Sequence, residues 1–284
     1  MTAETTGRAL PASPPAEAGA RGGGTARKTR RRTLPWWRQI LSVTVTLLVI
    51  QLLGVTGVLS RSSFPLVSSV LARLGRMTAD GAFWSSVGSS VTQALLGLAI
   101  GTAVAVPLGI LLGRLPLAEQ ALRPVIEFLR PIPSVALLPL VILTAGIGLG
   151  GAVILTALSS LWLVLVLTIR GARAVDPVAE QTLISFGVPR SARVHRLVLP
   201  SALPFIVTGV RVAASVSLIV AITAELLGGM PGLGKDVQVS LQSSDNVGVY
   251  ASTFAAGVLG LLVNLLIKPA EDRLLSWHAS RRSV

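Results

Sequence analysis

Long apolar runs without a charged residue restrict this chain more than any other feature. They occupy residues 39–60, 81–113, 131–169 and 246–267. A helix needs roughly 20 apolar residues to cross the hydrocarbon core of a bilayer, and inside lipid its backbone polar groups must be paired within the segment. The runs are far longer than the strands of a membrane barrel. The sequence therefore predicts an all-α integral membrane protein.

The runs can be divided into individual spans. The glycine-rich segment at 146–151 predicts a hairpin within the run 131–169. With that division, the sequence predicts six transmembrane helices: 39–60, about 91–112, two within 131–169, about 203–227, and one within 246–267.

Composition agrees with a membrane protein and limits the chemistry. The 284 residues are 51% hydrophobic and 13% charged, with a mean hydropathy of +0.73, which leaves too few charges for the surface of a soluble globule. Cysteine is absent, and the two histidines are far apart in sequence, so we expect no disulfide and no metal site. No G-x-S-x-G nucleophile elbow occurs. We therefore expect no catalytic residues, no cofactor and no enzyme activity in this chain.

The distribution of Lys and Arg predicts the orientation. If both termini are cytoplasmic, most of the 25 Lys and Arg residues fall in cytoplasmic segments, as the positive-inside rule requires. The predicted outer segments contain Arg61, Arg73, Arg76 and Lys235. We expect a multi-pass plasma-membrane protein with both termini in the cytoplasm.

The two ends of the chain are predicted to be cytoplasmic tails. Residues 1–26 are rich in Ala, Gly, Pro and Thr without an apolar period, so residues 1–38 are expected to be a disordered basic tail. The run RKTRRR within it is interpreted as a determinant of orientation, and a nucleic-acid-binding arm is the alternative. The transmembrane domain is expected over residues 39–275, followed by a short tail at 276–284.

A polar, turn-rich segment separates the predicted spans four and five. Asp176 as N-cap, Pro177 at the first helical position and Gly187 as a C-terminal stop predict a short helix. A second helix is predicted over residues 189–199. Two short helices that meet at a glycine resemble a helix-turn-helix, but the uncharged spans on either side would keep the pair away from a DNA groove. A simple connector is the other alternative.

The same segment resembles the EAA loop of permease subunits of binding-protein-dependent ABC importers. Gly187, nine further residues and then LVLP match the G-x9-I-x-L-P half of that motif. The stretches LRPIPSVALLPLVIL, AVDP, LPSALPFIVTGVRVA and AELLGGMPGLG are similar to the nitrate, sulfonate and taurine type of these permeases, over about residues 64–275. One position departs from the motif, because Gln181 stands where its first glutamate would be, and Glu180 is one place early.

The resemblance implies a function for the segment. In this family the EAA loop forms a cytoplasmic coupling helix, here between spans four and five, that docks on a separate ATPase subunit. The resemblance also implies a permease homodimer, two copies of the ABC ATPase, an external substrate-binding protein and a small anionic solute, with no nucleic acid involved. The residues expected in the ATPase-coupling loop are Glu180, Gln181, Phe186, Gly187, Arg190, Arg193, Leu199 and Pro200.

Two charged residues interrupt span five and are candidates for the translocation pathway or the permease dimer interface. Arg211 and Glu225 would lie about 21 Å apart along a helix, too far to pair with each other. Charges inside a membrane usually face a bundle interior or a wet cavity, and structural pairing with another group is the alternative to substrate contact. Glu271 and Asp272 follow span six and are interpreted as a solvated charge pair.

Two glycine-containing patterns are interpreted as features of the fold rather than as binding sites. The stretch GMPGLGKD at 229–236 nearly spells a phosphate-binding loop, but an aspartate stands where the motif needs a hydroxyl. It is interpreted as a turn-rich outer loop. The G-x3-G spacings at Gly97 and Gly101 and at Gly109 and Gly113 predict close helix packing along span two.

Two other functions compete with the ABC importer. A self-contained secondary transporter or channel would need an intramembrane proton or sodium relay, for which one Arg and one Glu are a poor supply. A membrane scaffold without transport is the third alternative, and it would not associate with an ATPase.

Overall fold

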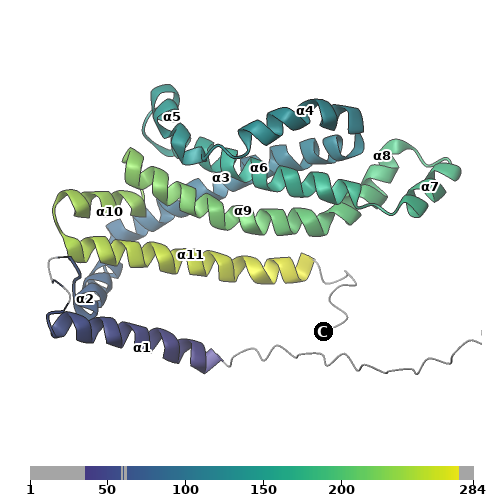
Figure 1. The fold of residues 1–284 in the computed structure, drawn as a ribbon. Coiled ribbons are helices and arrows are strands. Elements are labelled where there is room, and N and C mark those ends of the chain that lie inside the picture. Colours follow the sequence, from purple (N-terminus) through teal and green to yellow (C-terminus); the bar gives the residue numbers. More distant parts are fainter. Residues whose placement is uncertain (1–35, 59, 61–62, 275–284) are drawn as a thin grey trace, which may run out of the picture. The chain divides into compact units, whose positions relative to one another are not determined.

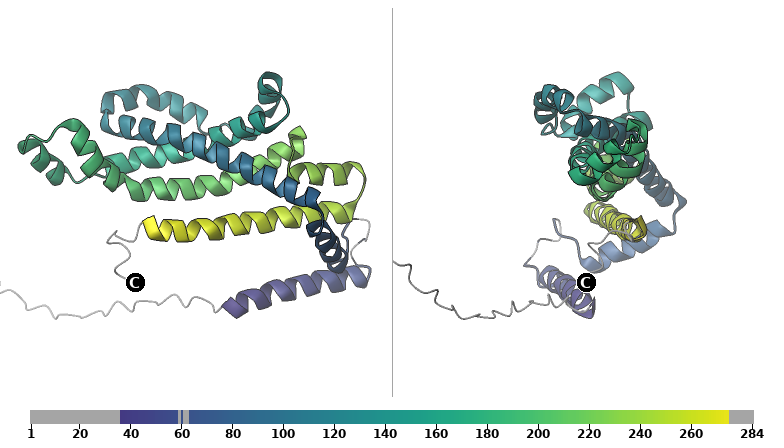
Figure 2. Two further views of the ribbon diagram at one scale, coloured as in Figure 1. Left: turned by 180° about the vertical axis from the view of Figure 1, so that it is seen from behind. Right: turned by 90° about the vertical axis from the view of Figure 1, so that its right-hand side faces the viewer.

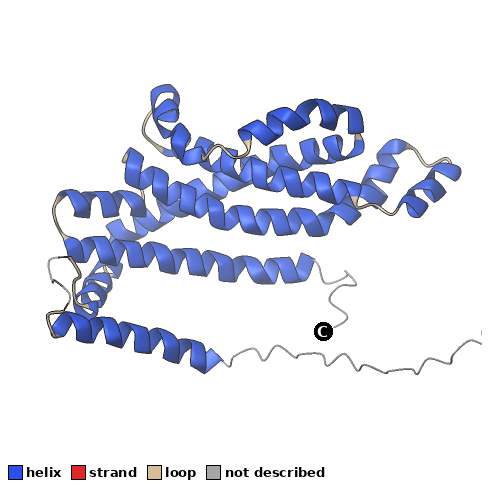
Figure 3. Cartoon of the chain, in the orientation of Figure 1, coloured by secondary structure: helices blue, strands red, loops and turns tan. Residues whose placement is uncertain are grey.

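The computed structural model describes residues 36–58, 60 and 63–274, and all regular structure in them is helical (Figures 1 and 3). The predicted all-α class is confirmed. The chain divides into two units, Met1–Val45 and Thr46–Val284, of which the first is described over the first half of α1 (Trp36–Val55). The predictions for residues 1–35 and for the tail at 276–284 lie outside the described residues.

The second unit continues with a series of helices and short turns. The long helices α3, α6 and α9 pack against one another, and α11 runs beside α9 (Figures 1 and 2). The elements are α2 (Val67–Thr78), α3 (Gly81–Arg114), α4 (Pro116–Leu129), the 3₁₀ turn η1 (Ser134–Leu137), α5 (Leu138–Ala145), α6 (Leu149–Arg173), α7 (Pro177–Ser185), α8 (Arg190–Arg193), the π turn η2 (Val194–Val198), α9 (Leu199–Gly228), α10 (Leu233–Gln242) and α11 (Asn246–Leu274).

Four helical stretches in the described residues are long and apolar enough to cross a bilayer. A fifth candidate combines α4 with η1 and α5, which are bent by 78° at the break between them. Ile40–Val55 is a shorter apolar helix. The four are Gly81–Arg114, Leu149–Arg173, Arg190–Gln242 and Asn246–Pro269. The fold is that of a multi-pass membrane protein with four to five candidate spans, and the count of six stays a prediction.

The region of the predicted span three differs from its prediction. Residues 114–130 connect the predicted spans two and three, yet most of them form α4, and the start of the run 131–169, where span three is predicted, holds the short elements η1 and α5. Pro131 and Pro133 explain the break, because proline has no amide hydrogen and disfavours helical geometry in the residue before it. One straight helix is thus replaced by a bent pair.

A ridge of small residues joins α3 to α6. An added Cβ at Gly101 would lie 2.6 Å from the carbonyl oxygen of Ala157, and one at Gly109 would lie 2.6 Å from Cβ of Thr168. In lipid, helices associate through close packing of small residues rather than through a hydrophobic driving force. The packing role predicted for the two G-x3-G spacings is therefore confirmed. The ridge consists of Gly97, Gly101, Ala105, Gly109 and Gly113, all buried.

Part of the α3 surface outside the ridge carries large apolar side chains that the described residues leave half uncovered. Leu95, Ile100 and Val104 are each about half exposed. Such a surface would promote association in water, whereas the acyl chains of a bilayer would solvate it. The helix is therefore suited to contact protein on its small-residue face and lipid on its large-residue faces.

Hydroxyl groups add polar links within the core. Thr156 donates to the carbonyl oxygen of Gln93 in α3 at 3.1 Å, and the hydroxyls of Ser160 and Ser217 lie 2.6 Å apart across α6 and α9. All of these side chains are buried. Each hydroxyl has a partner, so its burial does not leave an unsatisfied polar group.

Close packing at the ridge can be tested with a pair of substitutions in α3. Gly101→Ala should destabilise the purified protein by about 1–3 kcal/mol, because its Cβ meets the backbone of α6 and overpacks the contact. Gly88→Ala is the control, since no atom lies within 4 Å of an added Cβ there, and alanine favours a helix over glycine. Thermal unfolding should separate the two variants, and equal midpoints would contradict the role of the ridge.

The predicted topology can be tested with single cysteines, because the native chain has none. Ser191 and Ser243 are both exposed, before α9 and after α10 respectively. An impermeant thiol reagent should label a cysteine at Ser191 from the cytoplasmic face and one at Ser243 from the outer face, since a helix of membrane-spanning length separates them. Labelling of both positions from one face would overturn the arrangement.

Candidate functional site

The segment between α6 and α9 folds as the predicted short helix and turn. Asp176 caps α7 by accepting a hydrogen bond from the backbone N–H of Val178 at 2.8 Å. At the other end, Gly187 has φ of +69°, and the N–H groups of Gly187 and Val188 donate to the carbonyls of Ile184 and Leu183. This is a Schellman motif, in which glycine supplies the left-handed residue. The predicted cap, first turn and stop are therefore confirmed.

The helix α7 and the turn that follows it carry exposed apolar side chains. Phe186 is 80% exposed, Val178 69% and Ile184 53%. No atom of the described chain lies within 4 Å of a Cβ added at Gly187, so the backbone of the turn is accessible as well. We call Val178, Ile184, Phe186 and Gly187 the loop tip. Outside a membrane, three exposed large apolar side chains on one short helix and its turn favour contact with another protein.

Ion pairs fasten the base of α7 and α4 to the long helices. Glu180 pairs with Arg114 at the end of α3, and Glu119 of α4 pairs with Arg173 at the end of α6 at 2.9 Å. Glu180 thus has a partner within the chain and holds α7 in place, whereas Gln181, at the motif position of the glutamate, is exposed.

The second predicted helix does not end before Pro200. Instead α8 continues through the π turn η2 into α9 without a break. Proline has no N–H to donate to the preceding turn, and the N–H of Leu199 bonds to the carbonyl of Val194, five residues back. The wider turn accommodates Pro200 within one continuous helix, so the expected boundary at 199 is wrong.

The remaining residues predicted for the coupling loop follow α7 on this helix. Arg190 is exposed at its start, and Arg193 is half-buried. Leu199 and Pro200 are half-buried in the first turn of α9. The structure therefore places Phe186, Gly187 and Arg190 around the exposed turn, while Leu199 and Pro200 lie at the junction with the bundle.

Glu225 lies at the opposite end of α9, with no exposed surface. Its Oε2 accepts hydrogen bonds from the hydroxyl of Ser90 at 2.8 Å and from the N–H of Gly234 at 2.9 Å. The Ser90 hydroxyl in turn accepts from the N–H of Leu233 at 3.0 Å. The carboxyl group thereby joins α9, α3 and the start of α10. We call Ser90, Gln93, Glu225 and Gly234 the α10 anchor.

The glycine-rich stretch after Glu225 is held close to this carboxyl group. The Gln93 amide in α3 donates to the carbonyl of Pro231 at 2.6 Å, and Met230 and Leu233 have no exposed surface. A Cβ at Gly232 would collide with the Glu225 carboxyl group. The stretch predicted as an outer loop is therefore a buried turn that leads into α10, and this helix was not expected from the sequence.

Arg211, the other charged residue of α9, is paired with α11. Its Nη1 lies 2.6 Å from Oε2 of Glu271, and Glu271 is 9% exposed. The interpretation of Glu271 as a solvated charge is wrong, because α11 continues to Leu274 and carries the residue back against α9. Arg211 and Glu225 do not pair with each other, as expected, and their contact with a solute stays a prediction.

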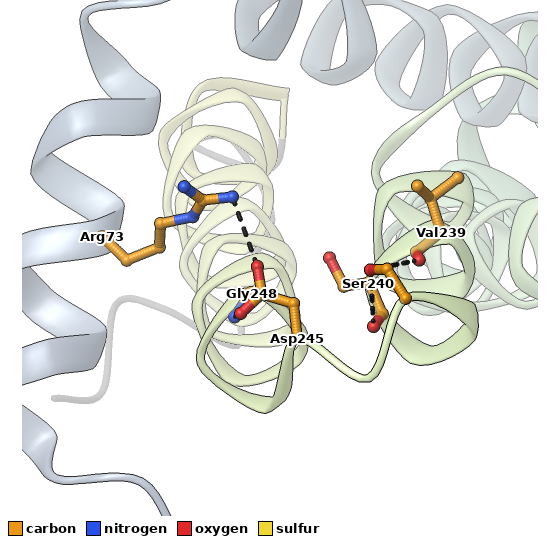
Figure 4. Close-up of polar contacts among 6 residues, drawn as sticks. Arg73, Val239, Ser240, Asp245 and Gly248 are labelled. Carbon is orange, nitrogen blue, oxygen red and sulfur yellow. Dashed lines mark hydrogen bonds and ion pairs between the residues drawn. The ribbon is translucent and has the colours of Figure 1, made fainter.

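A further polar link joins α2 to the turn between α10 and α11 (Figure 4). The Asp245 carboxylate accepts from Arg73 at 3.3 Å and from the N–H of Gly248 at 2.9 Å. Ser244 before it has φ of +55°, so the chain turns sharply there. The Asp245 side chain therefore caps the start of α11 and connects it to α2.

The residues of the site that the sequence did not predict are mainly hydrogen-bond partners of the charged groups and of the turn before α10. Ser90 and Gln93 stand in an uncharged run. The polarity of Gln93 inside a predicted span was the signal that its side chain faces the bundle interior rather than lipid. Within the described ranges, no group of three or more His, Cys, Asp and Glu side chains could hold a metal ion.

Comparison with known proteins gives one family. The sequence model described as "Binding-protein-dependent transport system inner membrane component" matches residues 105–274. The putative aliphatic sulfonates transport permease protein SsuC of Bacillus subtilis is 27% identical over 89% of this chain and 92% of its own. The taurine transport system permease protein TauC of Escherichia coli is 30% identical over 70% of this chain and 72% of its own. The nitrate import permease protein NrtB of Leptolyngbya laminosa is 27% identical over 68% and 69%.

Solved structures agree in fold. An inward-facing structure of the MetNI methionine ABC transporter superposes with a TM-score of 0.61 at 15% identity, covering 68% of this chain and 96% of that chain. A crystal structure of an amino acid ABC transporter with histidines gives a TM-score of 0.56 at 19% identity, covering 70% and 97%.

The α10 anchor can be tested at Glu225. Glu225→Ala should destabilise the protein by about 1–3 kcal/mol, because the buried N–H of Gly234 loses its acceptor. Glu225→Gln keeps an acceptor oxygen of similar geometry and should retain most of the stability. Thermal unfolding and transport should be measured for both. A Glu225→Gln variant with unchanged stability but altered affinity for the solute would contradict a purely structural role.

Proposed function

The chain belongs to the binding-protein-dependent transport system inner membrane component family, and from that premise we propose that it forms the translocation pathway for a small anionic solute and is driven by a separate ATPase subunit. Its relatives are ABC permease components for transport across a membrane. The coupling element we propose is the loop tip together with α7 and α8. ATP hydrolysis would occur in the partner subunit.

The exposed loop tip is the observation that carries this proposal. Phe186 is 80% exposed beside the accessible Gly187, although the segment follows α6 at the end where Arg170 and Arg173 mark a polar boundary. A water-exposed phenylalanine on a rigid turn is suited to fill a groove on a partner, because large aromatic side chains supply much of the binding energy at interfaces.

The loop is also mechanically suited to transmit a movement. α7 is fastened to α3 by Glu180 and Arg114, and α8 continues into α9 as one helix. A displacement imposed on the loop tip would therefore move α3, α6 and α9 together as a rigid body, as in domain and helix shifts generally. Arg190, exposed next to the tip, can pair with acidic groups on the ATPase and aid its orientation.

The proposed assembly contains two permease copies, two ATPase copies and an external substrate-binding protein. The transmembrane domain would comprise residues 39–275 with six spans, both termini in the cytoplasm and the loop tip on the cytoplasmic side. The excess of Lys and Arg in the predicted cytoplasmic segments supports this orientation. The names of the sulfonate, taurine and nitrate relatives support an anionic solute.

A self-contained secondary transporter is disfavoured by the partners of the two charges in α9. Arg211 is paired with Glu271, and Glu225 is hydrogen-bonded to Ser90 and Gly234. Both groups are therefore engaged in holding helices together, which leaves neither as an evident member of an ion relay.

The coupling proposal can be tested at the loop tip. Phe186→Ala should leave stability within about 0.5 kcal/mol of the native protein, because the side chain is exposed. Association with the ATPase, or solute-stimulated ATP hydrolysis by the assembled complex, should fall about tenfold, since an aromatic anchor is lost. Leu143→Ala, 83% exposed on α5, is the matched control and should have no such effect.

A crosslink gives the decisive readout for this proposal. A cysteine at the exposed Ser185 should crosslink to the ATPase in membranes, and Gly187→Asp should abolish the crosslink by penalising the left-handed turn and adding a charge at the tip. If the crosslink and full transport both persist in the Gly187→Asp variant, the segment is a connector and not a coupling element.

A further inference from the structure

A cavity of about 250 Å³ lies between α4 and the last turns of α6. Its charged lining comes from both helices: Glu119, Arg123, Glu127, Arg130, Arg170 and Arg173. None of these residues belongs to the loop tip, and none takes part in the α10 anchor. The cavity is therefore a separate feature, at the end of the bundle from which α7 leaves.

The cavity has unbalanced positive charge. Arg123 pairs with Glu127 at 2.7 Å, and Arg173 pairs with Glu119 at 2.9 Å. Arg130 and Arg170 line the same cavity, and among the residues that the structure describes neither has an ion-pair partner. Both acidic residues of the lining are thus neutralised, and two guanidinium groups from different helices remain for an external anion.

The two helices hold the arginines in different ways. Arg170 stands in the last turn of α6, whose buried face packs in the core with Leu165 and Ile169. Arg130 stands directly after α4, at the proline-marked break before η1. Both backbone positions are fixed by the fold rather than by a long flexible loop, and both guanidinium groups line one cavity, so only the side chains have to be ordered when an anion binds.

The opposite face of α4 is apolar and uncovered. Leu117 is 82% exposed, Phe128 73% and Val125 50%, and these positions fall on one side of the helix while Glu119, Arg123, Glu127 and Arg130 fall on the other. The helix therefore separates an apolar surface from the charged cavity. Arg130 and Arg170 are both exposed, so either a free anion or the headgroup of a neighbouring lipid can reach them.

We propose that the cavity between α4 and α6 is a binding site for an oxyanion group, a sulfonate or a phosphate, held by Arg130 and Arg170. A planar guanidinium offers paired N–H donors that match the oxygens of such a group. The group belongs either to a free anionic solute or to an anionic phospholipid, because both present the same tetrahedral oxygens. If the group belongs to a solute, the inference rests on the proposed function, because the solute would then bind at the cytoplasmic side of the translocation pathway.

The first arm of the test uses a free anion. Binding of radiolabelled methanesulfonate to the purified full-length protein would be measured by equilibrium dialysis at constant ionic strength. Arg130→Gln and Arg170→Gln should each weaken binding about tenfold, because one charge-assisted contact is lost. Arg76→Gln makes the same change of charge on exposed Arg76 of α2 and is the control, which should bind like the native protein.

A gain-of-binding variant guards against misfolding as the cause of a loss. Glu127→Gln removes the partner of Arg123, whose side chain is 64% exposed, and should strengthen binding by about two- to fivefold, as expected for release of an exposed ion pair. Arg130→Lys retains the charge but not the paired donors, so it should bind less tightly than the native protein and more tightly than Arg130→Gln.

The second arm uses lipid. The protein would be reconstituted in phosphatidylcholine with a small fraction of phosphatidylglycerol, and retained lipid would be identified by native mass spectrometry. Selective retention of phosphatidylglycerol that is lost in Arg130→Gln and Arg170→Gln, without methanesulfonate binding, would support the site with a lipid ligand. Methanesulfonate binding that is lost in the same variants would support the solute.

Several results would overturn the proposal. They are the absence of binding of both probes to the native protein or, for a probe that does bind the native protein, unchanged binding in the Arg130→Gln, Arg170→Gln double variant, an equal loss in Arg76→Gln, or no gain in Glu127→Gln. The coupling proposal is judged separately by the crosslink at Ser185, so the failure of one inference is distinguishable from the failure of the other.

Discussion

The contact between α3 and α6 is the interaction on which the rest of the structure depends. In water, the hydrophobic effect drives apolar helices together. A bilayer provides no such driving force, because lipid chains solvate a leucine side chain as well as another leucine does. A pair of membrane helices therefore needs a close fit. The small-residue ridge of α3 supplies that fit along four turns, with Thr156, Ser160 and Thr168 of α6 against it. Both helices then offer their remaining faces to α9 and α4, and the positions of those elements follow.

Charged and polar groups fix the two ends of this core in different ways. At one end the buried carboxyl group of Glu225 and the amide of Gln93 hold the start of α10 to α3. At the other end Arg114 and Arg173 hold α7 and α4 by ion pairs at the surface of the bundle. These ion pairs are partly exposed, so solvent weakens them, whereas a fully buried group costs free energy when its partner is removed. The α10 end is therefore expected to be the more rigid of the two, and the α7 end the more easily displaced by a partner.

The sequence predicted the structure correctly where a residue type has a single effect on the local backbone. Asp176, Pro177 and Gly187 specify a cap, a first turn and a left-handed stop, and the structure contains all three. The spacing of glycines in α3 likewise identified its packed face. Uncharged length identified most of the candidate spans, because lipid leaves the backbone no other partner.

The predictions were wrong where contacts between segments far apart in the sequence determine the structure. Glu271 is adjacent in sequence to other charges and looked solvated, yet its partner is Arg211, on another helix. The region 116–145 contains enough apolar residues for a span and enough prolines for a loop, and the structure combines both as a bent pair. Neither pairing between helices nor the angle at a break is encoded within a short window of sequence.

The bent pair and the loop tip together suggest how movement could reach the pathway. A straight span packed along its whole length resists displacement, because cores are close-packed and shift between discrete arrangements. The break after α4 lies at Arg130, one residue beyond the helix, and allows α4 to move relative to the segment that follows it. Glu119 connects the start of α4 to the end of α6, and α6 leads into α7. A push on α7 can thus alter the space between α4 and α6 without separating α3 from α6. The proposed anion site lies in that space, so occupancy of the site and the position of the coupling loop would be linked, and by reciprocity each would bias the other.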